Sequence, residues 1–126
     1  PIGKLNLEIN GVCDQVEFLL ARVGREVDES RNVSSVDRLV RDYFPRGLDI
    51  LHADIQGAEH DMLLGATESL DAGLIRNIFV STHSDTLHSD CIQEIVKYPF
   101  EIIKEVSPRK SSSYDGLIYA KKVISS

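Results

Sequence analysis

Short apolar runs alternate with segments of helical periodicity along most of this chain, and this alternation is the strongest constraint on its fold. Four segments are strand-like: residues 48–55, 78–80, 100–106 and 114–121. Between them, apolar residues recur every four positions over residues 58–70 and again over residues 87–95, which predicts two helices. This order favours an α/β fold with a mainly parallel sheet and an antiparallel closing strand.

The amino-terminal part of the chain has weaker patterns. Residues 2–9 have helical spacing, and the β-rich run 16–23 predicts a strand that Gly24 ends. The polar residues 25–32 are expected to form a loop. The capping pattern Ser34-x-x-Asp37 then predicts a helix that ends before Pro45. The run 48–55 is expected to be a buried central strand, because only His52 and Asp54 interrupt its apolar residues.

Composition limits the class of protein. The 126 residues of 14.1 kDa predict one domain spanning residues 1–126. Twenty acidic residues against 14 basic ones argue against a broad nucleic-acid-binding surface. No apolar run approaches the roughly 20 residues of a membrane helix, and no signal-peptide core is present, so neither a membrane partner nor secretion is expected. The two cysteines, Cys13 and Cys91, predict reduced thiols and a cytoplasmic protein.

Polar residues follow the predicted parallel strands, where ligands bind in open α/β sheets. They are Arg22, Asp54, Gln56 and the run Ser81-Thr82-His83-Ser84. A carboxylate directly after an apolar strand costs desolvation energy, which favours a functional role for Asp54. His83 is a base near neutral pH, a metal ligand, a donor to a substrate oxygen, or a loop histidine held by neighbouring hydroxyls. Glu59 either contacts a ligand or caps the following helix.

Metal and nucleophile motifs are mostly lacking. The sequence has no glycine-rich phosphate loop, no GxSxG elbow and no HExxH. His83, His88 and Cys91, with Asp85 and Asp90, have a spacing that does not favour a structural metal site, so no metal is assigned. A metal-dependent hydrolase that uses Asp54, His83 and His88 is the weakest of the functions considered.

Three ordered blocks resemble the FkbM family of S-adenosylmethionine-dependent methyltransferases. The blocks are Leu51-His52-Ala53-Asp54-Ile55-Gln56-Gly57-Ala58-Glu59, Ile78-Phe79-Val80-Ser81-Thr82-His83-Ser84 and Ser113-x-Asp115-Gly116-Leu117-Ile118. The resemblance implies a Rossmann-like class I methyltransferase fold, with S-adenosyl-L-methionine as cofactor. It also implies methyl transfer to a hydroxyl of a small molecule or glycan.

The resemblance assigns roles to individual residues. Asp54 and His83 are expected to be catalytic, orienting or deprotonating the acceptor hydroxyl. The residues expected to bind the cofactor are Arg22, Val23, Asp54 and Gln56, and those expected to contact the acceptor are Glu59, Ser81 and Ser84. Two positions depart from the family pattern. His52 stands where many members have Lys, and Gln56 stands where many have Glu, so this position keeps an acceptor oxygen but has no carboxylate charge.

The resemblance also places a glycine-rich cofactor motif and the first two strands before Pro1. The class I sheet has the strand order 3-2-1-4-5-7-6, so a chain without strands one and two would expose two inner sheet edges. We therefore expect a fragment of a longer protein, or a homodimer that covers those edges. The alternative function is a catalytically inactive, methyltransferase-like module that self-associates or binds a partner.

Overall fold

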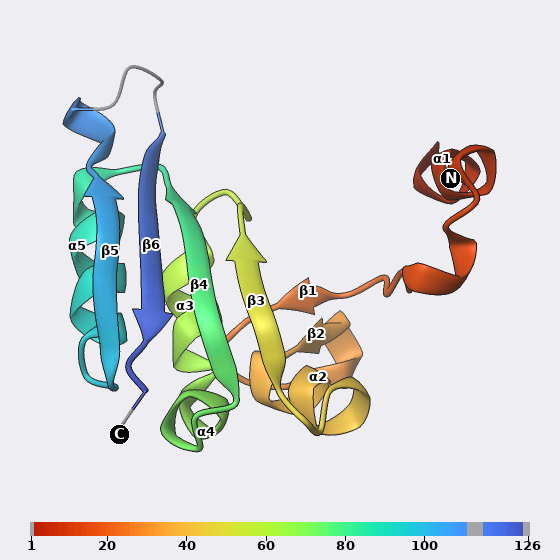
Figure 1. Cartoon of the computed structure of the whole chain (residues 1–126), viewed down its shortest axis with the longest axis horizontal. Helices are drawn as coiled ribbons and strands as arrows, with labels where there is room; N and C mark the ends of the chain where they lie inside the picture. Colours follow the sequence, from red (N-terminus) through yellow and green to blue (C-terminus); the bar gives the residue numbers. More distant parts are fainter. Residues whose placement is uncertain (1, 111–114, 125–126) are drawn as a thin grey trace.

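Four strands form the main sheet, in the spatial order β3-β4-β6-β5 (Figure 1). In the computed structural model, which describes residues 2–110 and 115–124, the strands are β3 (Leu48–Ala53), β4 (Ile75–Thr82), β5 (Phe100–Val106) and β6 (Gly116–Lys122). β3 and β4 are parallel, whereas β6 is antiparallel to β4 and to β5. β5 therefore points the same way as β3 and β4. The predicted α/β class, with a mainly parallel sheet and an antiparallel closing strand, is confirmed.

Three helices cover one face of this sheet: α3 (Glu59–Leu64), α4 (Thr67–Asp71) and α5 (Asp85–Ile95) (Figure 1). The core lies between these helices and the sheet, and its fully buried side chains include Leu63, Ile78, Ile95 and Ile118. Because successive strand residues point to opposite faces, alternate positions of β4 and β6 enter this core. The predicted apolar face of α5 is confirmed, since Cys91 and Ile95 are buried and Leu87 packs against the core.

The closing pair β5 and β6 contains one irregularity of register. Ile102 pairs with Ala120, but Lys104 pairs with Tyr119, so Ile103 is an extra residue on β5. The short 3₁₀ helix η3 (Pro108–Lys110) follows β5. The antiparallel pairing was predicted, and the serine-rich turn predicted between the two strands, residues 111–114, lies outside the described residues.

Helix α2 (Val36–Tyr43) begins one residue later than the capping pattern predicts. The side chain of Ser35, not Ser34, accepts a hydrogen bond from the Arg38 backbone N–H at 3.2 Å. The Asp37 carboxylate accepts instead from the backbone N–H groups that begin α4, 2.8 Å from Ser69 and 3.1 Å from Glu68. Both serines are favourable N-cap residues, but Asp37 binds α4 and does not complete a capping box with Ser34.

The single helix predicted over residues 58–70 is two helices, α3 and α4, which are separated at Gly65 and Ala66. The Gly65 carbonyl accepts a hydrogen bond from Asp37 N at 2.9 Å and is thus bound outside its own helix. A Cβ at Gly65 would also lie 2.2 Å from the carbonyl oxygen of Gly24. The helix breaks where another part of the backbone packs directly against it.

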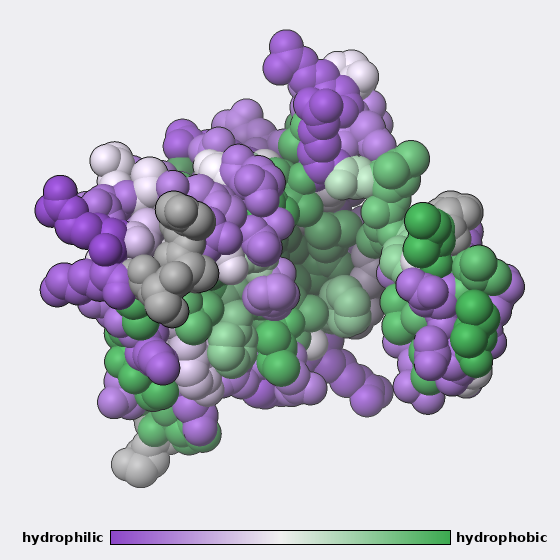
Figure 2. Space-filling view, turned by 90° about the horizontal axis from the view of Figure 1, so that it is seen from above, coloured by the Kyte–Doolittle hydropathy of each residue, from purple (hydrophilic) through white to green (hydrophobic). Residues whose placement is uncertain are grey.

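The amino-terminal arm, residues 2–21, lies away from the main sheet (Figure 1). Its helix α1 (Ile2–Asn10) was predicted, but it buries none of its residues, and the 3₁₀ helix η1 (Cys13–Gln15) follows it. The strand predicted over residues 16–23 is wrong for most of its length. Only β1 (Arg22–Val23) forms, because its pairing partner β2 (Val33–Ser34) is equally short. Figure 2 shows apolar residues gathered in the hollow between the arm and the rest of the molecule.

Two further expectations need correction. The loop predicted over residues 25–32 contains the 3₁₀ helix η2 (Glu29–Arg31), which the Asp28 carboxylate caps. The predicted central strand β3 is an edge strand of the four-stranded sheet, and Ile50 at its middle is 58% exposed. Its apolar composition is that of a strand with neighbours on both sides, but within the described residues only β4 pairs with it.

Candidate functional site

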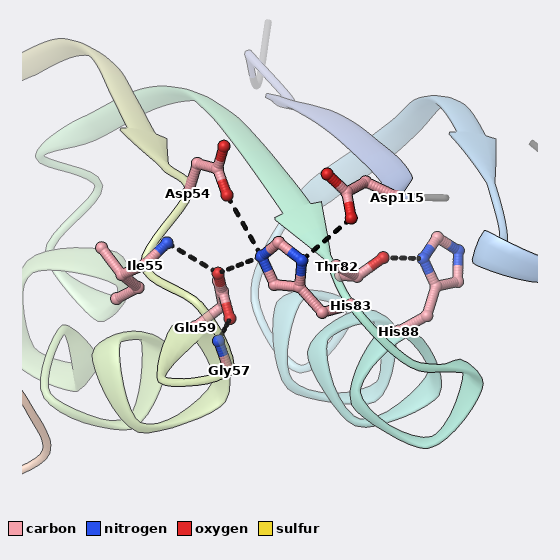
Figure 3. A network of polar contacts seen from close by, with 8 residues as sticks. All are labelled: Asp54, Ile55, Gly57, Glu59, Thr82, His83, His88 and Asp115. Carbon is pink, nitrogen blue, oxygen red and sulfur yellow. Dashed lines mark hydrogen bonds and ion pairs between the residues drawn. The ribbon is translucent and has the colours of Figure 1, made fainter. Parts of the chain in front are cut away.

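The parallel strands β3 and β4 bring Asp54 and His83 together. Asp54 directly follows β3, His83 directly follows β4, and the carboxyl ends of these strands meet at one edge of the sheet. The His83 Nε2 atom lies 3.1 Å from Asp54 Oδ1 (Figure 3). Asp54 is half exposed, with 48% of its side chain accessible, whereas the accessible share of the His83 side chain is 20%. The two residues predicted to be catalytic are therefore in contact and reachable from solvent.

Glu59 anchors the loop that carries Asp54. Its fully buried carboxylate accepts hydrogen bonds from the backbone N–H of Ile55 at 2.8 Å and of Gly57 at 2.9 Å (Figure 3). Gln56 and Gly57 both have positive φ, 57° and 106°, so the backbone turns sharply here. Glu59 thus holds the turn between β3 and α3. This role is structural, but it is not the predicted capping of α3, because both N–H groups precede that helix and its N-cap has no side-chain hydrogen bond. The Oε1 atom of Glu59 also lies 3.4 Å from His83 Nε2.

Asp115 is a member of the site that sequence reasoning did not identify. Its Oδ1 atom lies 3.0 Å from His83 Nδ1 (Figure 3). Polar site residues were expected at the carboxyl ends of parallel strands. β6 is antiparallel, so the residue before its amino end reaches the same edge, where Gly116 pairs with Thr82. The available signal was the Asp115-Gly116 pair immediately before a predicted strand.

Three carboxylates surround the imidazole of His83. Burial alone would lower the pKa of His83, but the hydrogen bond with Asp115 and the charges of Asp115, Glu59 and Asp54 outweigh it. The pKa of His83 is therefore raised above its ordinary value of 6.5. Both ring nitrogens face carboxylate oxygens, so the doubly protonated ring is the form that donates to both sides.

We expect the His83 ring to titrate above pH 6.5 in the folded protein, measured by NMR with a chelator present. Because the folded pKa is raised, this group contributes stability that is fully present below pH 6.5. That contribution is lost as the pH rises through the folded pKa. Asp115→Asn should lower the midpoint, because it removes a neighbouring negative charge. A midpoint at or below 6.5 in the unsubstituted protein would contradict the geometry of this cluster.

The remaining predicted residues lie apart from this cluster or in structural roles. Ser84 caps α5, since its hydroxyl accepts from Leu87 N at 3.1 Å. Ser81 lies half-buried in β4, where it pairs with Leu117. Arg22 and Val23 form β1, and the following Gly24 packs on Gly65 at the opposite end of α3 from Glu59. Among the described residues, no hydrogen bond or ion pair joins Arg22 or Val23 to Asp54 or His83.

His88 belongs to a separate, buried network. Its Nδ1 atom lies 2.7 Å from the Thr82 hydroxyl, and its Nε2 atom contacts the Glu105 carboxylate. A carboxylate only accepts, so Nε2 is the donor in the contact with Glu105. The side chain of His88 thus contacts Thr82 of β4 and Glu105 of β5. It does not share a site with His83, as the metal-dependent hydrolase would require. Cys91 is buried, and burial, together with the charges of Glu59 and Asp90, raises the pKa of its thiol to about 12.

Comparisons with protein-family models, with curated proteins and with solved structures gave no match. Among residues 2–110 and 115–124, no helix has the length and apolar character that crossing a bilayer requires. The function of this chain therefore has to be argued from the site itself and from the order of its strands.

Proposed function

We propose that this chain is an S-adenosylmethionine-dependent O-methyltransferase of the FkbM type, or the carboxyl-terminal part of one. The acceptor is a hydroxyl on a small molecule or a glycan. The observation that carries the proposal is the contact between Asp54 and His83 at the ends of adjacent parallel strands. These are the two residues to which the family resemblance assigns catalysis.

The topology supports the same proposal. The order β3-β4-β6-β5, with β6 opposed to its neighbours, is the order of strands 4-5-7-6 in the class I methyltransferase sheet. On this proposal, strands one and two would lie beside β3. Within residues 2–110 and 115–124, β3 pairs on one side alone, with β4, which agrees with this position. The short strand β1 would be the end of strand three, with Arg22 and Val23 beside the cofactor's adenine.

The chemistry requires a group that takes or directs one proton. A bond forms between the acceptor oxygen and the methyl carbon, while the sulfur–carbon bond of the sulfonium breaks and its electron pair stays on sulfur. The acceptor hydroxyl must lose its proton during this step. Asp54 is the better exposed of the two catalytic residues. Its carboxylate would accept a hydrogen bond from the acceptor hydroxyl and take the proton as the oxygen–methyl bond forms, while His83 holds that carboxylate in place. Three carboxylates also favour the positive sulfonium nearby.

Calorimetric titration with S-adenosylhomocysteine, in buffer containing a chelator, tests this proposal. We expect binding heat, weakened by Asp54→Asn and unchanged by His52→Ala, since His52 is exposed on β3 and has no contact with the site's carboxylates among the described residues. If near-millimolar S-adenosylhomocysteine gives no binding heat, the chain does not bind the cofactor by itself.

An inactive, self-associating module is the second candidate. The observation in its favour is the apolar surface of the arm, where Ile2 is 78% and Leu20 is 94% exposed. Burial of such side chains against a second copy or another partner would be favourable. Light scattering on the sample used for calorimetry separates the two candidates. An oligomer that gives no binding heat supports the module, whereas a monomer that binds S-adenosylhomocysteine contradicts it.

A further inference from the structure

Three donor atoms from three different segments converge at the site. They are Asp54 Oδ1, Glu59 Oε1 and His83 Nε2, and all lie within 4.8 Å of one another. Among the described residues, this is the group of His, Cys, Asp and Glu side chains whose donor atoms lie close enough to share one ion. Two carboxylate oxygens and one imidazole nitrogen are a donor set that suits first-row divalent ions such as Zn²⁺ and Mn²⁺.

The distances fit the edges of a coordination polyhedron. Bonds of about 2.1 Å from an ion to nitrogen or oxygen, at octahedral or tetrahedral angles, place neighbouring donors about 3.0 to 3.4 Å apart. His83 Nε2 lies 3.1 Å from Asp54 Oδ1 and 3.4 Å from Glu59 Oε1. Nε2 carries at most one proton, so a proton satisfies only one of these two oxygens. An ion at the shared position would satisfy both.

Charge favours a cation at the same position. With His83 protonated, its three carboxylate neighbours still leave the cluster with a net negative charge. Glu59 is fully buried, so its charge is shielded from water and depends on nearby groups for compensation. Its two backbone hydrogen bonds hold the carboxylate in one orientation. Asp54 is half exposed, which leaves a route for an ion and open coordination positions.

Asp115 supplies the outer contact that metal-binding histidines commonly have. Its oxygen lies 3.0 Å from His83 Nδ1, the ring nitrogen that does not face Asp54 and Glu59. A carboxylate there keeps the proton on Nδ1 and leaves the Nε2 lone pair for an ion. Asp115 and His83 thus form the carboxylate–histidine pair that commonly supports a metal ligand.

We propose that Asp54, Glu59 and His83 bind a divalent first-row transition metal ion, with Asp115 as a positioning residue. Imidazole ligation favours such an ion over Mg²⁺, which prefers oxygen ligands and retains water. This proposal does not require methyl transfer. It applies equally to an inactive module, in which the ion would hold the ends of β3 and β4 together.

Calorimetry with Zn²⁺ alone and with Mn²⁺ alone, on protein freed of metal by chelator and dialysis, measures the affinity. We expect one ion per chain, an affinity at least about 100-fold weaker in His83→Ala, and one about 10- to 100-fold weaker in Asp115→Asn. His52→Ala, on an exposed histidine two residues from Asp54, is the matched control and should bind as the unsubstituted chain does. Circular dichroism checks that each variant is folded.

A second measurement keeps the test independent of folding in the variants. In the unsubstituted protein, Zn²⁺ should shift the ¹⁵N resonance of His83 Nε2 and leave those of His52 and His60 in place. A shift at His52 or His60 in place of His83, or equal affinity in His83→Ala, would overturn the proposal. Because S-adenosylhomocysteine binding is measured in chelator, failure of the metal site and failure of the methyltransferase proposal are distinguishable.

Discussion

Replacing Glu59 by alanine is expected to lower the free energy of unfolding by about 3 kcal/mol. The substitution removes the acceptor of two backbone N–H groups, those of Ile55 and Gly57, and leaves a cavity where a fully buried side chain was. Hydrogen bonds to an ionised acceptor are stronger than bonds between neutral groups. The carboxylate also holds Gln56 and Gly57 at positive φ, which is a strained backbone conformation for Gln56. Urea denaturation measures the loss.

Two variants bracket that result. Glu59→Gln keeps one acceptor oxygen in place and should lose about half as much stability, because the amide satisfies one of the two N–H groups. Glu68→Ala, on an exposed glutamate in the first turn of α4, is the matched control and should change stability by less than about 0.5 kcal/mol. Equal effects at Glu59 and Glu68 would show that the buried carboxylate does not hold the loop.

Ile78→Ala should lower the free energy of unfolding by about 2 to 5 kcal/mol. Ile78 lies at the middle of β4, is fully buried beneath the helices, and is flanked in the sheet by Leu51 and Ala120. The truncated side chain leaves a cavity that the surrounding strands and helices cannot close, because both neighbouring strands hold β4 in place. Thermal or urea unfolding, monitored by circular dichroism, measures the effect.

Ile50→Ala on the neighbouring strand is the matched comparison. The residue type is the same, but Ile50 is 58% exposed, so the expected loss is below about 1 kcal/mol. A loss at Ile50 as large as that at Ile78 is incompatible with an exposed Ile50 side chain, and would mean that another surface covers this face of β3 in solution.

The parts of the fold that follow from local patterns were predictable. β3, β4 and α5 each have a short apolar run or a four-residue period, and parallel strands bring their carboxyl ends together, which is why Asp54 and His83 could be paired in advance. Contacts between distant segments decided the rest. The helix break at Gly65 depends on Gly24 and Asp37, and Asp115 reaches the site because its strand is reversed.

The strand predicted over residues 16–23 failed for a related reason. β propensity describes how well side chains fit a pleated surface between neighbours, and it does not supply those neighbours. Within the described residues, only the two residues of β2 pair with this segment, so two residues of it form a strand. The apolar side chains that produced the prediction, Leu19 and Leu20 among them, are exposed.

The extra residue in β5 decides which charge lies beside His88. Ile103 has no partner on β6, so the residues after it point to the opposite faces from those that regular alternation would give them. Glu105 pairs with Ile118 and lies on the helix-covered face of the sheet. Lys104 pairs with Tyr119 and lies on the other face. If the same residues continued in regular register after Ile102, Lys104 would lie opposite Ile118, on the side where the carboxylate of Glu105 now contacts the ring. His88 in turn holds the hydroxyl of Thr82, the residue before His83. A single shift of register in one edge strand thus determines which charge supports the site from below.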